Sequence, residues 1–258
     1  MSIIPTPLPE WDYPPCKNTL NYIVCSIPRT GSNLLCYTLA QQRNAGVPLE
    51  YFNLSPNQMS LAKRLGFNFD EKEPYHQLFA QLKAYSHRLQ QFRSTPNGAF
   101  GVKVHWLHFD LLFERQPTPR FLETVFEQPK LIFMHRKDRV AQAVSYYFAD
   151  ESQQWFAQDS EAVFCPPYNY QRLLELIKVI RYSEEGWLRY LETVKHLPVM
   201  KICYEDLVAD FEHTVKNVYD FLGIDTNALD LKPPIAKQSH SLKDEYAERF
   251  TKQFLNKS

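Results

Sequence analysis

The sequence predicts an α/β fold in which a central parallel sheet carries helices on both faces. Short apolar runs alternate with helical patterns along the chain, and two of these runs end in a charged turn that leads directly into a helix. The chain has 258 residues, of which 44% are hydrophobic, enough to bury one sizeable core. We expect a proline-rich extended arm over residues 1–19 and a single domain over residues 20–258.

The predicted strands are apolar runs, and they lie at 22–27, 99–104, 131–134 and 199–203. Helical spacing of apolar residues predicts helices at 58–64, 75–92, 120–126, 139–148, 170–196 and 211–222, with a last helix from residue 242. Gly223 closes the helix that precedes it. Both charged turns would then lie at the carboxyl ends of strands, where open parallel sheets bind their ligands.

The first charged turn follows the run at 22–27 and contains Arg29, Thr30, Gly31, Ser32 and Asn33. Free N–H groups at a helix N-terminus, the positive end of the helix dipole and an arginine fork together suit phosphate or sulfate. A nucleotide-triphosphatase P-loop would need Gly-Lys-Ser/Thr here, and no lysine follows the glycine. We therefore expect a P-loop-like phosphate site without an obvious metal ligand. The alternative is an ordinary strand–helix connection.

The second charged turn follows the run at 131–134. Arg136 stands at the end of that run, Asp138 is the expected N-cap of the next helix, and Ser145 comes nine positions after Arg136. Nine positions place the serine about two turns into the helix, where its hydroxyl and the guanidinium could meet the same phosphate. Lys137 and Arg139 are interpreted as solvated surface charges.

This pair of turns resembles the two nucleotide sites of sulfotransferases, and the chain as a whole more closely resembles the bacterial trehalose 2-sulfotransferase family. The segments that carry the resemblance run in the same order from about residue 20 to residue 245, at 28–32, 45–52, 97–106, 135–145 and 184–187. The arginine-to-serine spacing of the second turn is one residue longer than in the better-known cytosolic branch.

The resemblance implies the sulfotransferase fold and a 3′-phosphoadenosine-5′-phosphosulfate donor, with adenosine 3′,5′-bisphosphate as product. It places the 5′-phosphosulfate at the first turn, on Arg29, Thr30, Gly31, Ser32 and Asn33, and the 3′-phosphate at Arg136 and Ser145. A basic loop near the C-terminus returns to the nucleotide in sulfotransferases, which makes Lys237 and Gln238 candidates as well. A plain surface loop is the alternative for these two residues.

Sulfuryl transfer needs a base for the acceptor hydroxyl and positive charge for the departing phosphate. Glu50 lies where the family's proposed base falls, and a carboxylate in a partly desolvated cleft is expected to have a raised pKa. The alternative for Glu50 is a loop carboxylate or a helix cap. Arg29 is the predicted stabiliser of the leaving phosphate, because a guanidinium holds phosphate oxygens in bidentate fashion and stays charged.

Three further residues are predicted to face the acceptor: Lys103, His105 and Tyr51. Lys103 stands at the end of a strand and could equally extend into solvent. His105 and His135 could carry protons near neutral pH, although a lone histidine beside a strand is more often structural. The acceptor is expected to be a carbohydrate or a similar small hydroxyl compound, and fold-level similarity does not choose between them.

Charge and cysteine content restrict the remaining function classes. Basic and acidic residues both number 29 and the pI is about 7.1, which argues against a nucleic-acid or membrane-binding surface. The five cysteines show neither CxxC pairing nor metal spacing, so we expect no metal. With no signal peptide and no long apolar stretch, the prediction is a reduced cytoplasmic protein. The resemblance also suggests a homodimer.

Two other functions stay open from the sequence. One is a nucleotide-dependent phosphotransferase of the P-loop type, disfavoured by the missing Gly-Lys-Ser/Thr signature. The other is a nucleotide-binding protein without catalysis, which would be expected to lack Glu50 or Arg29.

Overall fold

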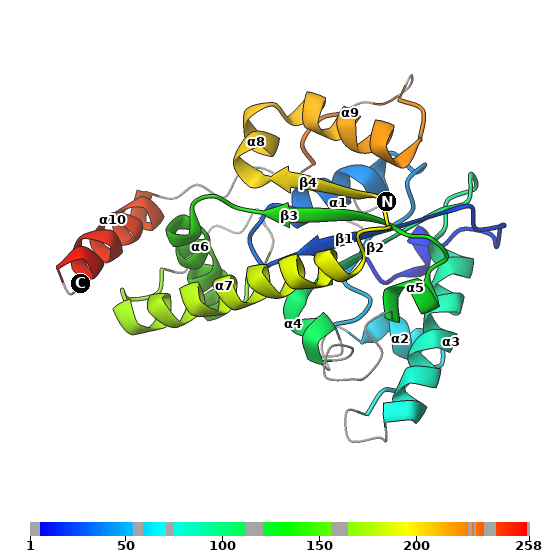
Figure 1. Cartoon of the computed structure of the whole chain (residues 1–258), viewed down its shortest axis with the longest axis horizontal. Helices are drawn as coiled ribbons and strands as arrows, with labels where there is room; N and C mark the ends of the chain where they lie inside the picture. The colour runs from blue at the N-terminus through cyan, green and yellow to red at the C-terminus, as the bar shows by residue number, and fades with distance from the viewer. Residues whose placement is uncertain are drawn as a thin grey trace.

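The computed structural model describes residues 6–53, 59–70, 75–111, 121–155, 165–226, 229, 231–234 and 241–256. Four strands form one sheet in the order β2-β1-β3-β4, and every neighbouring pair is parallel. The strands are β1 (Leu20–Ser26), β2 (Ala99–His105), β3 (Lys130–His135) and β4 (Val199–Cys203). Figure 1 shows this twisted sheet at the centre of the molecule. The predicted parallel α/β architecture is confirmed.

The strands read as continuous apolar runs because both faces of the sheet are covered. All seven residues of β2 are buried, as are all of β1 except Leu20. One face packs against α1 (Ser32–Gln41), α8 (Tyr204–Ala209) and α9 (Phe211–Leu222). The other packs against α3 (Tyr75–Arg93), α4 (Trp106–Phe109), α5 (Phe121–Val125), α6 (Arg139–Ser152) and α7 (Tyr170–Thr193). Helices therefore lie on both faces, as predicted.

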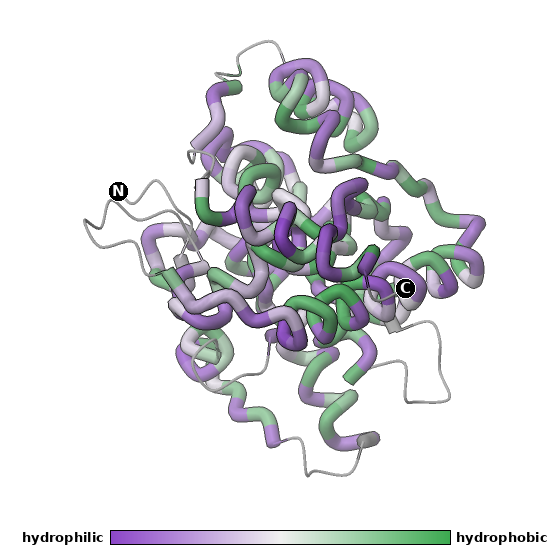
Figure 2. The backbone as a smooth tube through the Cα atoms, turned by 90° about the vertical axis from the view of Figure 1, so that its left-hand side faces the viewer, coloured by the Kyte–Doolittle hydropathy of each residue, from purple (hydrophilic) through white to green (hydrophobic). Residues whose placement is uncertain are grey.

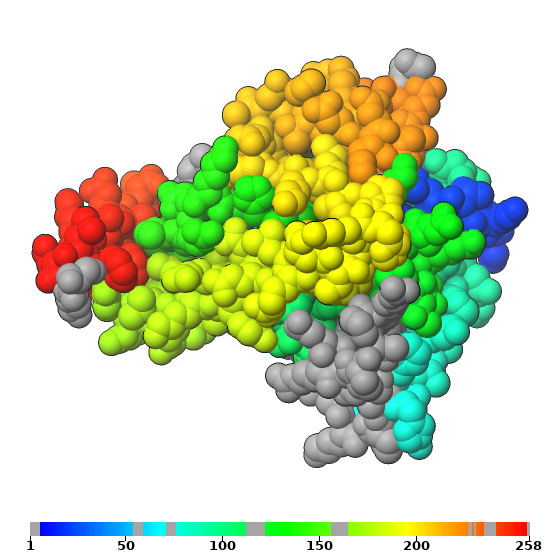
Figure 3. All heavy atoms as spheres, viewed as in Figure 1, coloured from blue at the N-terminus to red at the C-terminus, as the bar shows by residue number. Residues whose placement is uncertain are grey.

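Two further helices complete the second layer: α2 (Ser60–Arg64) and α10 (Ser241–Leu255). Along the helices, hydrophilic and hydrophobic residues follow one another within each turn, as the colours of Figure 2 show. This is the pattern of helices that place one face on a core and the other in water. At one end of the molecule α10 packs against α6, as the space-filling view in Figure 3 shows.

Several predicted helix boundaries need correction. Helix α6 runs to Ser152 rather than 148, and ends where Gln153 takes a left-handed conformation. Helix α7 ends at Thr193, not 196. The one-turn helix α4 and the short α8 were not predicted, because such short segments cannot show a helical period. Residues 58 and 120, the expected starts of two helices, lie outside the described residues.

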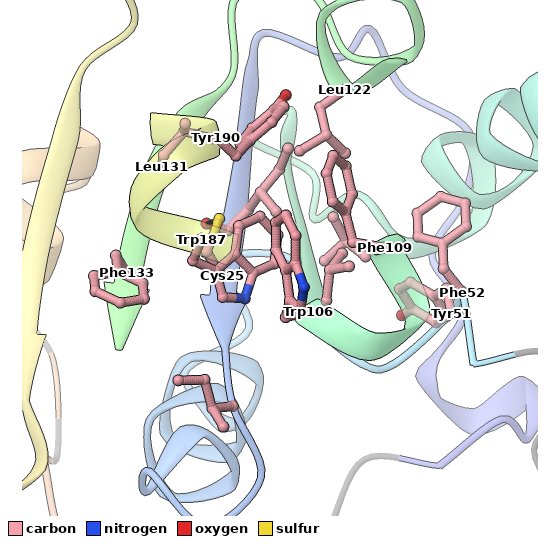
Figure 4. Packing of buried hydrophobic residues seen from close by; sticks show 14 of the residues in the cluster. Cys25, Tyr51, Phe52, Trp106, Phe109, Leu122, Leu131, Phe133, Trp187 and Tyr190 are labelled. Atoms are coloured by element: carbon pink, nitrogen blue, oxygen red, sulfur yellow. Dashed lines mark hydrogen bonds between the residues drawn. The ribbon is translucent and has the colours of Figure 1, made fainter. Parts of the chain in front are cut away.

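A cluster of large aromatic side chains fixes α7 against the end of β1. Trp106, Phe109 and Trp187 pack together there (Figure 4). The indole N–H of Trp187 donates a hydrogen bond to the carbonyl oxygen of Ser26, the last residue of β1 (2.9 Å). Trp106 approaches α7 so closely that a Cβ on Gly186 would lie 2.0 Å from its ring. This packing anchors the strand end from which the first charged turn leaves.

The described part of the N-terminal arm, residues 6–19, is packed onto the domain. Residues Pro9–Trp11 form a short 3-10 helix, and the Trp11 side chain is buried. Asp12 makes ion pairs with Arg64 of α2 (2.7 Å) and with the fully buried Arg93 of α3 (3.2 Å). The described part of the arm therefore belongs to the same packed body as residues 20 onward.

Candidate active site

The order of the strands brings four segments together at one edge of the sheet. Because the strands are parallel, the segment after β1, the last residues of β2, the segment after β3 and the start of α8 after β4 all lie at the same edge. β1 lies between β2 and β3, so the strands that follow β1 in the chain are added on both sides of it. The strand order reverses at this point, and open parallel sheets bind their ligands at such a reversal. The predicted site residues come mainly from these four segments.

The first charged turn is tight, with two residues in the left-handed region. Gly31 has a φ of 76° and forms the N-cap of α1, and Arg29 has a φ of 68°, which is uncommon for a residue with a side chain. The Thr30 hydroxyl donates to the carbonyl oxygen of Ile27 (2.8 Å), which stabilises the turn. Tyr204 packs against the turn, since a Cβ on Gly31 would lie 2.6 Å from its ring. The first N–H groups of α1 are thereby presented at the sheet edge.

Arg29 joins the two predicted phosphate sites. Its Nε donates a hydrogen bond to Oγ of Ser145 (3.0 Å), and Nη1 donates to the carbonyl oxygen of Trp155 (3.1 Å). Burial, together with repulsion from Arg136, lowers the pKa of Arg29 to about 10. The sequence placed Ser145 with Arg136 and treated the two turns as separate. In the structure Ser145 contacts Arg29, so the turns form one cationic cluster.

Arg136 extends from the end of β3 into the same cluster. Its guanidinium lies over the ring of Tyr204, 4.5 Å from the ring centre, and its Nε is 3.6 Å from Oε1 of Glu205. Nε has no hydrogen-bond partner among the described residues although it is buried. Asp138 caps α6 through the N–H of Ala141 (2.8 Å), as predicted. The guanidinium of Arg136 is thus mostly buried, and Glu205 balances its charge only in part. A guanidinium in this state suits an anionic ligand.

Lys243 of α10 is a third cation of this region, and sequence reasoning did not find it. Its Nζ lies 5.3 Å from the ring centre of Phe148, one helical turn beyond Ser145 on α6. Burial and repulsion from Arg29 and Arg136 lower the pKa of Lys243 to about 8. No motif marks this lysine, because its place depends on how α10 docks on α6.

Glu50, Lys103 and His105 form a second cluster at the other side of the first turn. Oε1 of Glu50 lies 2.7 Å from Nζ of Lys103 and 3.1 Å from Nε2 of His105. Lys103 also donates a hydrogen bond to Oδ1 of Asn33, in the first turn of α1. A single lysine thus links the predicted base to the predicted phosphate turn.

Backbone pairing explains why these residues meet. Leu49 forms an isolated parallel bridge with Val102. The N–H of Lys103 donates a hydrogen bond to the carbonyl oxygen of Leu49 (3.0 Å). This contact holds the segment that carries Glu50 beside β2. His105 is fixed from its other side, because its Nδ1 is 2.9 Å from Oγ of Ser26. Asn33, Glu50, Lys103 and His105, all predicted site residues, are brought together.

The electrostatics of Glu50 differ from the expectation. Burial alone raises its pKa, but the attraction of Lys103 and of His105 outweighs burial and holds the pKa well below its usual range. The expectation of a raised pKa is therefore wrong for this arrangement. Glu50 is a carboxylate at neutral pH, ready to accept a proton but weak as a base while Lys103 is in contact with it.

Tyr51 does not lie where the sequence placed it. Its side chain is buried and packs on Phe100, and its hydroxyl donates to the carbonyl oxygen of Val47. Figure 4 shows Tyr51 beside Phe52 in the aromatic core. We correct its predicted acceptor contact to a packing role. Lys237 and Gln238, the predicted C-terminal contacts, lie outside the described residues.

Two negative observations hold for the part of the chain that the structure describes. No group of three or more His, Cys, Asp and Glu side chains is arranged to hold a metal ion. Nor does any helix there combine the length and apolar character needed to cross a bilayer.

Solved sulfotransferases share this architecture. A sulfotransferase from Alicyclobacillus acidocaldarius superimposes with a TM-score of 0.53 over 90% of this chain and 92% of its own, at 17% identity. The sulfotransferase domain from the curacin biosynthetic pathway gives 0.53 over 92% and 98%, also at 17% identity. At such identities the similarity shows the fold alone, and that fold is the sulfotransferase fold.

A model of the Stf0 sulphotransferase family matches residues 21–253, and the chain therefore belongs to that family. The trehalose 2-sulfotransferase of Mycolicibacterium smegmatis is 28% identical over 251 residues, which cover 89% of this chain and 93% of that one. The trehalose 2-sulfotransferase of Mycobacterium tuberculosis is 27% identical over 255 residues, with the same coverage. The resemblance found in the sequence is confirmed.

Proposed function

We propose that this protein transfers a sulfuryl group from 3′-phosphoadenosine-5′-phosphosulfate to a hydroxyl of a carbohydrate or a similar small molecule. The observation that carries the proposal is the contact of Lys103 with both Glu50 and Asn33. This contact supports the proposal because it joins a carboxylate that can accept a proton to the first charged turn, where the phosphosulfate would bind.

The cationic cluster fits the charge of the donor. Arg29 and the N–H groups at the start of α1 would hold the phosphosulfate end, and Arg136 would hold the 3′-phosphate. Ser145, which accepts a hydrogen bond from Arg29, would add a hydroxyl, and Lys243, whose pKa is lowered by burial and by both guanidiniums, would add a third positive charge. The closest carboxylate contact of Arg136 is at Nε, 3.6 Å from Oε1 of Glu205, so its two terminal nitrogens would be the ones to meet the phosphate.

In the proposed reaction the acceptor oxygen bonds to sulfur while the bond from sulfur to the phosphate oxygen breaks. Glu50 takes the hydroxyl proton, and Arg29 balances the charge that the departing phosphate gains. Lys103 would turn from Glu50 to the sulfuryl oxygens when the donor binds. Loss of that ion pair would raise the pKa of Glu50 and strengthen it as a base. His105, fixed by Ser26, would keep the carboxylate in place.

A carbohydrate acceptor is supported by the two trehalose 2-sulfotransferases, since they match along nearly the whole chain. The Glu50 carboxylate is partly exposed, and Asn53 Nδ2 lies 3.3 Å from its second oxygen. A carboxylate and an amide side by side can accept and donate hydrogen bonds, which suits the hydroxyls of a sugar.

The central test is Glu50→Gln, a change that keeps the size of the side chain and removes the proton acceptor. We expect turnover of the donor with a responsive acceptor, found by screening trehalose and other sugars, to fall about 100-fold to 10,000-fold. Affinity for adenosine 3′,5′-bisphosphate, measured by calorimetry, should stay unchanged. Glu248→Gln, an exposed change on α10, is the control and should keep full activity.

Full turnover by Glu50→Gln would remove the residue from its assigned role. A protein stabilised against heat by ATP with magnesium but not by adenosine 3′,5′-bisphosphate would instead be a phosphotransferase. Binding of the bisphosphate without turnover of any acceptor in a broad screen would indicate a non-catalytic nucleotide-binding protein.

A further inference from the structure

Arg136 has to hold its guanidinium in one place if it is to recognise a 3′-phosphate. A free arginine side chain loses rotamer entropy when it is fixed, and this loss weakens binding unless the side chain is fixed beforehand. In the described residues Arg136 is mostly buried, and two consecutive residues at the start of α8 approach its guanidinium. These are Tyr204 and Glu205.

The two residues restrain Arg136 in different directions. The ring of Tyr204 lies against the guanidinium, 4.5 Å from ring centre to Cζ, and restricts movement out of the guanidinium plane. Glu205 makes its closest approach at Nε, 3.6 Å from Oε1. Because Nε is the inner nitrogen of the fork, this contact leaves the two terminal nitrogens to meet a ligand.

Glu205 is itself held by the turn that carries Arg136. Its oxygens accept hydrogen bonds from the N–H groups of Lys137 (3.0 Å) and Asp138 (3.2 Å), and the Cys203 thiol donates to it as well (2.9 Å). Burial raises the pKa of Glu205, but the bonds from Cys203 and the two N–H groups outweigh it and lower the pKa to about 2. The carboxylate is thus charged and fixed throughout the working range of pH.

The position of Glu205 also restricts where a phosphate can bind. Its carboxylate already accepts hydrogen bonds from the N–H groups of Lys137 and Asp138 in the turn before α6, and these groups would otherwise attract an anion. A phosphate must therefore approach Arg136 from the side away from Glu205. Arg29, whose pKa is lowered by burial and by the charge of Arg136, donates a hydrogen bond to Ser145.

We propose that Glu205 is a positioning residue, which holds Arg136 for the 3′-phosphate and so gives the site its preference for nucleotides that carry that group. This inference rests on the proposed function, because it takes the nucleotide of that function as the ligand. A purely structural role for Glu205, bracing the β3–α6 turn against β4, would affect stability but not the choice between nucleotides.

The test compares two ligands, adenosine 3′,5′-bisphosphate and adenosine 5′-phosphate, by calorimetry at constant ionic strength. In Glu205→Gln we expect the affinity for the bisphosphate to fall about tenfold, and that for the monophosphate to change less than twofold. Simple loss of a negative charge would strengthen the binding of both ligands, so the sign separates positioning from bulk electrostatics. Asp206→Asn, an exposed neighbour that pairs with Lys137, should keep the wild-type ratio.

A double mutant ties the effect to Arg136. On an Arg136→Ala background, Glu205→Gln should leave the affinity ratio unchanged, since the group it positions is gone. An unchanged ratio in Glu205→Gln alone, or a full effect on the Arg136→Ala background, overturns the inference. Glu205→Asp, which keeps the charge but shortens the side chain, should also lower the ratio and serves if the glutamine variant folds poorly. A wild-type protein without preference for the bisphosphate would instead overturn the proposed function itself.

Discussion

At the scale of single residues, Lys243 is expected to make nucleotide binding by the cationic cluster depend on pH. Its pKa is lowered to about 8 by burial and by Arg29 and Arg136, while Cys165 acts in the opposite direction. A nucleotide bound as proposed would add negative charge near Lys243 and raise this pKa. Below about pH 8 the lysine is charged with or without ligand. Above it, binding takes up a proton, so the affinity falls as the pH rises.

We therefore expect the affinity for adenosine 3′,5′-bisphosphate to drop several-fold between pH 7.5 and about 9.5, a range in which the phosphates no longer titrate. Lys243→Met should bind more weakly at the lower pH and show a flatter profile. Lys252→Met, on the exposed side of the same helix, is the control and should keep the wild-type slope. Calorimetric titrations at five or six pH values measure all three. An unaltered slope in Lys243→Met would show that the lysine does not meet the nucleotide.

Gly31 permits a second test at this scale, because the chain offers a matched glycine. Both Gly31 and Gly66 have positive φ, but a Cβ would meet Tyr204 at 2.6 Å in the first and nothing within 4 Å in the second. In Gly66→Ala the free energy of unfolding should fall by about 1 kcal/mol, from backbone strain alone. Gly31→Ala should lose about 1–3 kcal/mol more from the clash, as measured by urea unfolding. Equal losses would mean that Tyr204 yields without strain.

Some residues of the candidate site could be predicted from the sequence, and others could not. Arg29, Lys103, His105 and Arg136 could be located because each lies near the carboxyl end of a strand or in the turn that follows it, and parallel strands bring those ends together. Tyr51 was misplaced because residues in an irregular segment do not reveal which way a side chain points. Glu205 and Lys243 were missed because their roles depend on contacts with distant parts of the chain.

At the scale of elements, Gly186 shows packing that opposes helix propensity. It lies inside α7, where alanine is the better helix former by about 1 kcal/mol. A Cβ there would, however, lie 2.0 Å from the buried ring of Trp106. We expect Gly186→Ala to be destabilised by about 1–2 kcal/mol net, since overpacking a core outweighs the gain in propensity. Arg189→Ala, at an exposed site of α7, should stay within about 0.5 kcal/mol of the wild type.

Urea unfolding of the two α7 variants decides this point. A stabilised Gly186→Ala would mean that Trp106 can move aside, and that the glycine is not needed for the contact of α7 with the core. The tryptophan that follows, Trp187, donates to the end of β1, so strain here would also reach the first charged turn.

Long elements were predicted better than short ones, for a physical reason. Helices α3, α7 and α9 repeat an apolar face over several turns, and the strands are mainly apolar, with Lys103 a charged residue inside β2 and Lys201 one inside β4. Helices α4 and α8 span one or two turns after a strand, too few for a period to be visible. Helix α6 extends past its last apolar residues, because no glycine or proline stops it before Gln153.

At the scale of the whole molecule, the arm and the domain are joined by a buried charge. The side chain of Arg93 is fully buried in α3, where Asp12 lies 3.2 Å from Nε and the carbonyl oxygens of Thr6 and Leu8 accept hydrogen bonds from Nη1 and Nη2 (2.9 and 3.2 Å). Asp12 also binds Arg64 through both oxygens (2.7 and 2.8 Å). The predicted boundary at residue 19 followed proline content, which carries no information about such distant pairing.

Asp12→Ala should therefore destabilise the whole protein, because it leaves the buried Arg93 guanidinium without the carboxylate that balances its charge. Removal of one member of a buried ion pair costs about 3–5 kcal/mol, whereas replacement of the pair by apolar residues costs much less. We expect Asp12→Ala to lose about 3 kcal/mol in urea unfolding, and Asp12→Ala with Arg93→Met to lose less than the sum of the single changes. Glu10→Ala, an exposed carboxylate of the same arm, is the control and should have little effect. If Asp12→Ala and Glu10→Ala proved equally mild, Arg93 would have to find other partners, and the arm would be a covering rather than a structural part of the domain.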